Sequence, residues 1–127
     1  MPEHLLFILK RKNMKHYIRT ITWKFQDSAI AYPQLEHKRI KITSPHDIFQ
    51  NFAFLFEGQV RERFIVFWLN SQNVITGFEV ITEGLLNSSL VHPREVFRGA
   101  IVATSANIIL AHNHPSGNQD PLVKIYQ

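Results

Sequence analysis

One apolar run sets the strongest limit on how this 127-residue chain can fold. Residues 64–69 read Phe-Ile-Val-Phe-Trp-Leu, without a polar interruption. A run of this kind is typical of a central strand that is buried on both faces. Residues 70–73 predict a turn, and residues 74–84 predict one or two more strands with a bend at Gly77. We therefore expect an α+β or α/β layered domain that contains an antiparallel meander.

Capping signals mark the start of two helices. Ser44 has the character of an N-cap, with Pro45 at the first helical position and Asp47 in the first turn. This helix is expected to end near Gly58. Pro93 predicts the start of the second helix.

Further strands are predicted on both sides of this central part. Residues 17–25 alternate and are rich in β-branched and aromatic side chains, which predicts a half-buried strand. Residues 39–43 predict a short edge or lead-in strand. Residues 107–111 form an apolar run that predicts a strand leading into two histidines.

Composition narrows the classes of protein that the chain can belong to. Apolar residues make up 45% and argue against disorder, and no apolar run is long enough to span a membrane. The chain lacks cysteine, which fits a cytoplasmic protein and excludes thiolate zinc sites. Residues 1–41 hold nine Lys or Arg against three acidic residues, whereas the remainder holds five against seven. This basic segment could contact nucleic acid phosphates or could simply be solvated.

His112 and His114 are the clearest chemical feature of the chain. Side chains two residues apart share one face of a strand, so both imidazoles can point to one side at a strand end. Pro115 and Gly117 then turn the backbone. This arrangement is half of a metal site, although such a pair can also be no more than two solvated histidines.

The surrounding sequence resembles the RadC family, whose domain has the MPN (JAB/JAMM) metallopeptidase-like fold. The most specific matches are His-Asn-His-Pro-Ser-Gly and, before it, Val-His-Pro-Arg-Glu-Val-Phe; the matching stretches are residues 42–45, 62–70, 83–97 and 112–117. The resemblance implies a mixed sheet with flanking helices and a cytidine-deaminase-like architecture. It also implies zinc-dependent hydrolysis of a peptide or isopeptide bond, and an association with DNA repair.

The family's metal pattern is incomplete here. By the family's spacing, a Ser is expected at position 122 and an Asp ligand at position 125, but this chain has Leu122 and Ile125. Asp120 is a nearby carboxylate that could reach the metal only from a different position. The chain also stops where the resemblance implies a further helix and strand, so we expect C-terminal elements to be missing.

Glu62 is the residue that the resemblance implies as the catalytic base. A carboxylate at the start of an apolar strand is partly desolvated, which favours a base, but Arg61 and Arg63 beside it would have the opposite effect. The alternative is an ordinary solvated glutamate. Glu79, Glu83 and Glu95 have structural reasons to be present, and His92 is expected to precede a helix rather than to bind metal.

These patterns divide the chain into a basic segment 1–41 with a strand, a partial RadC-like domain 42–121, and a divergent tail 122–127. The leading hypothesis is a zinc hydrolase in which His112 and His114 hold a weakly bound ion and Glu62 takes a proton from water, with activity impaired by the missing third ligand. The alternatives are a non-enzymatic nucleic-acid or protein interaction module, and a truncated product without function.

Overall fold

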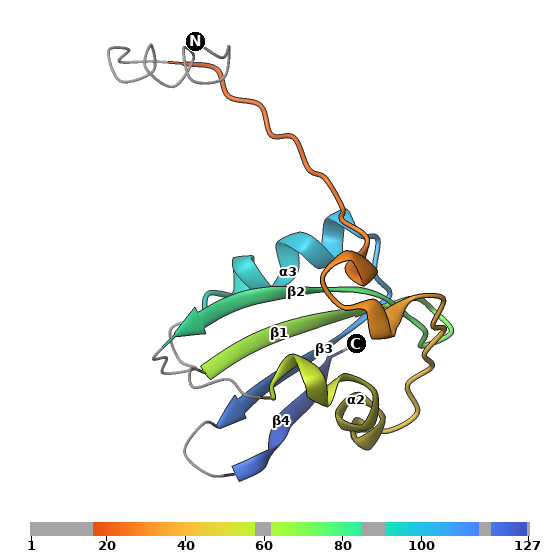
Figure 1. Cartoon of the computed structure of the whole chain (residues 1–127). Coiled ribbons are helices and arrows are strands. Elements are labelled where there is room, and N and C mark those ends of the chain that lie inside the picture. Colours follow the sequence, from red (N-terminus) through yellow and green to blue (C-terminus); the bar gives the residue numbers. More distant parts are fainter. Residues whose placement is uncertain (1–16, 58–61, 85–90, 115–117, 127) are drawn as a thin grey trace.

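The computed structural model describes residues 17–57, 62–84, 91–114 and 118–126. Within these residues the domain has four strands and two α-helices (Figure 1). The helices are α2 (Pro45–Phe52) and α3 (Pro93–Val102), and the strands are β1 (Glu62–Leu69), β2 (Ile75–Gly84), β3 (Asn107–His114) and β4 (Asn118–Tyr126). Short 3-10 turns cover Ser28–Ile30 (η1), Pro33–Leu35 (η2) and Ala53–Leu55 (η3).

The four strands form one antiparallel sheet in the order β2-β1-β3-β4. Strand β1 is therefore an interior strand, and its residues 65–69 are all buried, as the apolar run predicted. The turn after β1 is built by Asn70, whose side-chain oxygen accepts hydrogen bonds from the backbone N–H groups of Gln72 and Val74. Asn73 has a positive φ of 61°, a conformation that asparagine tolerates better than most residues.

Each face of the sheet is covered by one helix (Figure 1). Alternate residues of β1 and β3 point to opposite faces, and this alternation separates two apolar clusters. The cluster that includes α2 contains Ile48, Phe52, Ile65, Phe67, Leu69, Ile109 and Ala111. The cluster that includes α3 contains Val66, Trp68, Val96, Ala100 and Ile108. The predicted α+β layered fold is confirmed.

Local hydrogen bonds fix the start of both helices. The Asp47 carboxylate accepts hydrogen bonds from the backbone N–H groups of Thr43 and Ser44 and from the Thr43 hydroxyl. These bonds, led by that of the Thr43 N–H, favour the charged carboxylate and lower the pKa of Asp47. At α3, His92 is the N-cap, and its Nδ1 accepts a hydrogen bond from the backbone N–H of Arg94. His92 thus precedes a helix, as expected.

Three predictions about local structure are wrong. Residues 17–25 are extended but form no strand ladder, because no described strand pairs with them. Residues 39–43 contribute only one isolated bridge, between Lys41 and Val74. Helix α2 ends at Phe52 and continues as the 3-10 turn η3, so it does not reach Gly58 as a regular helix.

The sequence analysis also missed β4. Residues 122–126 were expected to be a divergent tail, but they pair with residues 108–112 of β3 and cover its edge. Leu, Val, Ile and Tyr favour strands, which explains the pairing. Pro121 lacks a backbone N–H, and it lies where the pairing between His112 and His114 is irregular, on an edge strand that tolerates proline.

No helix in the described part of the chain is long and apolar enough to cross a membrane.

Candidate metal centre

The structure brings Glu62 and His112 together. Glu62 begins β1, and His112 lies near the end of β3, two strands that run antiparallel with Phe64 opposite His112. The His112 Nδ1 lies 3.3 Å from the Glu62 Oε1, and the two side chains are only 11% and 16% exposed. Two residues that are 50 positions apart in sequence thus form a close polar contact in a largely buried setting.

Phe64 fixes the orientation of the His112 ring. The two rings are parallel, with an interplanar angle of 3° and centroids 5.9 Å apart. Phe64 also packs against the apolar cluster beneath α3, so it is itself held in place. Glu62, Phe64 and His112 therefore lie on the face of the sheet that α3 covers.

Asn113, between the two histidines, has a structural role on the backbone. It is buried, and its Oδ1 accepts a 2.7 Å hydrogen bond from the backbone N–H of Arg63. The Arg63 guanidinium donates to the Leu55 carbonyl at 2.8 Å, which ties this end of β1 to the turn η3. The neighbours of His112 thus anchor β1 and β3 to each other and to the segment that follows α2.

The structure places the other predicted ligand positions only by their backbone. His114 ends β3 and pairs with Asn118, and Asp120 lies in β4; their side chains lie outside the described part of the structure. Leu122, at the position expected for Ser, pairs with His112, whereas Ile125, at the position expected for Asp, pairs with Ile109. Positions 122 and 125 are an odd number of residues apart, so in a strand they belong to opposite faces.

The competing carboxylates lie elsewhere or have other partners. Glu79 of β2 is 3.6 Å from the Arg98 guanidinium of α3. Glu95 lies in the first turn of α3, where a negative charge interacts favourably with the helix dipole. Glu83 pairs through its backbone with Arg63, and its side chain lies outside the described part. Among the carboxylates whose side chains the structure describes, Glu62 is the one beside His112.

His112 and Glu62 supply an imidazole nitrogen and a carboxylate oxygen, which are donor types that zinc accepts. Metal-binding histidines commonly give one ring N–H to a carboxylate, which orients the ring and leaves the second nitrogen with the lone pair that binds the ion. The Glu62 carboxylate lies where such a partner would lie, 3.3 Å from the His112 Nδ1, although the two groups are not aligned as a hydrogen bond. Among the residues whose side chains are described, no group of three or more His, Cys, Asp or Glu is placed to hold a metal. A complete ligand set needs His114 or another group beyond that part.

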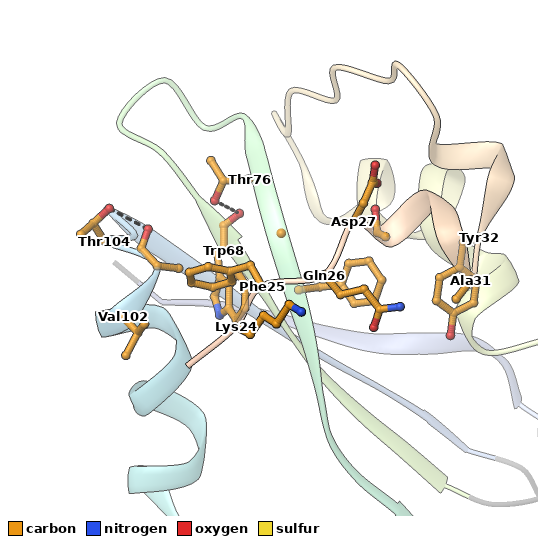
Figure 2. A pocket seen from close by; sticks show the side chains of 14 residues that line it. Lys24, Phe25, Gln26, Asp27, Ala31, Tyr32, Trp68, Thr76, Val102 and Thr104 are labelled. Carbon is orange, nitrogen blue, oxygen red and sulfur yellow. Dashed lines mark hydrogen bonds between the residues drawn. The ribbon is translucent and has the colours of Figure 1, made fainter. Parts of the chain in front are cut away.

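A second feature, which the sequence analysis missed, is a cavity of about 700 Å³ beside Trp68, at the end of β1 that lies away from Glu62. Figure 2 shows its lining, which includes Phe25, Tyr32, Trp68 and Thr104. The Phe25 ring meets the Trp68 ring edge to face, with centroids 5.9 Å apart. The sequence contains one partial signal for this region, because a glycine inside a strand indicates a close contact. Gly77 is that glycine, and an added Cβ there would lie 2.7 Å from the Trp68 ring.

Comparison with known proteins identifies the class of domain. The family model described as RadC-like JAB domain matches residues 42–123. Similar proteins include "UPF0758 protein SH1266" of Staphylococcus haemolyticus, 47% identical over 85 residues, which are 67% of this chain and 37% of the relative. A UPF0758 protein of Staphylococcus carnosus is 51% identical over 89 residues, covering 70% of this chain and 39% of the relative. One from Methanosarcina mazei is 42% identical over 87 residues, covering 68% and 38%.

These matches show the family. The chain belongs to the RadC-like JAB domain family, which confirms the resemblance seen in the sequence. It spans less than two fifths of the length of these curated relatives.

Proposed function

We propose that this chain is a metal-binding JAB-family domain in which His112 and His114 hold a zinc ion and Glu62 is the proton acceptor of a hydrolytic site. The observation that supports the ligand role of His112 most is the 3.3 Å contact between the Glu62 carboxylate and the His112 Nδ1, which makes Nε2 the nitrogen that would bind the ion; the role of Glu62 as proton acceptor rests on the family resemblance. Imidazole nitrogen and carboxylate oxygen are common donors to zinc. When bound, zinc would act as a Lewis acid and lower the pKa of a water molecule.

Glu62 is suited to take a proton near His112. Its side chain is only 16% exposed, so it is largely removed from bulk water. The same carboxylate contacts the His112 Nδ1, which would hold the ring in one orientation. Phe64, stacked on His112, restricts the ring further. The substrate class that we propose is a peptide or isopeptide, by family resemblance.

We propose further that the chain as given is impaired as a hydrolase. Leu122 and Ile125 offer only hydrocarbon where the family pattern has Ser and Asp. Loss of one donor that stabilises an oxyanion typically lowers the rate by about a hundredfold to a thousandfold. The strand register adds a second obstacle, since positions 122 and 125 of a strand cannot face the same site, whereas positions three apart on a helix can.

A hydrolysis assay with point variants tests this proposal. We expect no hydrolysis of a peptide or isopeptide substrate above background, either by the chain or by the double variant Leu122→Ser/Ile125→Asp. The matched control is Leu122→Ala/Ile125→Ala, which changes the same strand without adding donors. Hydrolysis that a chelator abolishes and that Glu62→Gln removes would show that the site is already complete, with Asp120 as the leading candidate for the third ligand.

A further inference from the structure

A basic arm leaves the domain: Lys24 and Phe25 at its root line the cavity beside Trp68, and the residues before them lead away from the sheet (Figure 1). We define the arm as residues 18–25, which are extended and exposed and lead away from the sheet (Figure 1). Ile18 is 98% exposed and Ile21 is 70% exposed, and Trp23 and Phe25 are also exposed. A row of large apolar side chains on an alternating, extended segment is the pattern of a strand that lacks its sheet.

The sheet has an edge strand, β2, on which an extended segment of this type could pair. Strand β2 is at the end of the strand order, and on its outer side the described residues form only the bridge Lys41 to Val74 and the hydrogen bond from the Ile75 N–H to the Ile40 carbonyl. The rest of β2 forms no ladder on that side with any described residue. An exposed strand edge is a template on which another extended segment can pair.

The arm and this edge are complementary in length and charge. Residues 76–78 of β2 line the cavity together with residues 24–28, 31 and 32 of the same copy, so the arm of a second copy would run along residues 79–84, at about 3.3 Å per residue. The arm carries Arg19 and Lys24 and no acidic residue, whereas β2 carries Glu79, which pairs with Arg98 of α3, and Glu83, and has no basic residue. The arm also lies outside residues 42–123, which the family model matches.

The root of the arm is not directed along the edge of its own sheet. Phe25 is held against Trp68, which belongs to the cluster beneath α3 (Figure 2), and from there the arm leads away from the sheet (Figure 1). Each copy therefore offers both an unpaired arm and an open edge, which is the condition for a closed twofold exchange between two copies.

We propose that the arm of one copy adds as a strand to the outer edge of β2 of a second copy, and that the same contact in reverse closes a dimer. The exchange would cover the open edge of both sheets and the exposed apolar side chains of both arms. The exchange does not depend on the metal centre.

Disulfide capture between single-cysteine variants tests the exchange, because the full chain has no cysteine of its own. Thr20→Cys and Thr22→Cys on the arm are each mixed with Val80→Cys on β2 and oxidised. The matched control replaces the β2 partner by Arg94→Cys, an exposed position on α3. We expect at least one arm variant to form a covalent dimer with Val80→Cys several times faster than with Arg94→Cys.

Sedimentation of the full chain supplies the second readout. We expect a dimer that Ile21→Pro weakens at least tenfold in dissociation constant, since proline removes a ladder N–H, whereas Ile21→Val leaves the constant unchanged. A monomer at all concentrations would overturn the proposal. A Thr22→Cys/Val80→Cys double variant that closes a disulfide within one copy would also overturn it, since the arm would then lie on its own sheet. Salt-sensitive binding of single-stranded DNA by a monomer, lost in Ile21→Pro, would show that the arm is a nucleic-acid surface instead.

Discussion

Replacement of Asn113 by alanine tests how the segment that carries the histidines is held. The substitution removes the acceptor of the 2.7 Å hydrogen bond from the Arg63 N–H, at a residue that is only 8% exposed. A net hydrogen bond contributes about 0.5–1.5 kcal/mol, and a buried donor that loses its partner costs about 1–3 kcal/mol. We therefore expect Asn113→Ala to lower the free energy of unfolding by about 2 kcal/mol, near the middle of the second range.

The same substitution at Asn107 provides the control. Asn107 lies on the same strand, but its side chain donates to Asn73 in a hydrogen bond that is exposed to solvent. Water can replace that partner, so Asn107→Ala should cost no more than about 0.5 kcal/mol, as for most surface substitutions. Urea denaturation followed by circular dichroism measures both values. Equal losses for the two variants would refute the reasoning, because burial of the Asn113 bond would then have no energetic consequence.

Two other predictions concern packing and pH. Gly99→Ala should be destabilising by about 1–2 kcal/mol although alanine favours helices, since its Cβ would meet the Glu79 carboxylate and lie 2.9 Å from the Trp68 ring, which Gly77 confines on the other side; thermal unfolding should show that the penalty disappears in a Glu79→Ala/Trp68→Phe background, and a more stable Gly99→Ala would contradict it. The difference in free energy of unfolding between wild type and Asp47→Asn should be constant well above pH 3.8, the ordinary pKa of the carboxyl. It should shrink as the pH falls through the lowered pKa of Asp47. Denaturation at pH 7 and pH 3 measures the difference, and a difference that grows in acid would contradict the prediction.

Local signals in the sequence were enough to predict the central sheet and both helix starts. The apolar run 64–69 has one common explanation, a strand buried on both faces, and the structure confirms it. Asp47 and Pro93 stabilise helix starts within a few residues of their own positions, so the starts of both helices could be predicted without tertiary information.

The failures depend on partners that are distant in sequence. Residues 17–25 have the alternation of a strand, but alternation does not say whether an edge is available to pair with. Conversely, residues 122–126 looked like a divergent tail because a family pattern broke off there, whereas β3 offered them an edge.

The candidate site was predictable in part. The family resemblance implied Glu62, His112 and His114 together, and the antiparallel pairing of β1 with β3 explains why the first two meet. The role of Asn113 in binding the Arg63 backbone required the register of the two strands, which no local pattern supplies.

Zinc titration of the purified chain, followed by calorimetry, tests the proposed metal centre most directly. We predict weak binding that is lost on dialysis, because two ligands leave the ion poorly oriented. His112→Ala and His114→Ala should each abolish it, whereas Glu62→Gln should only weaken it, by about 10- to 100-fold, since Glu62 is proposed to orient the His112 ring and not to bind the ion. Tight, stoichiometric zinc that survives both histidine substitutions and Asp120→Ala would contradict the account, because the ion would then be held by other groups.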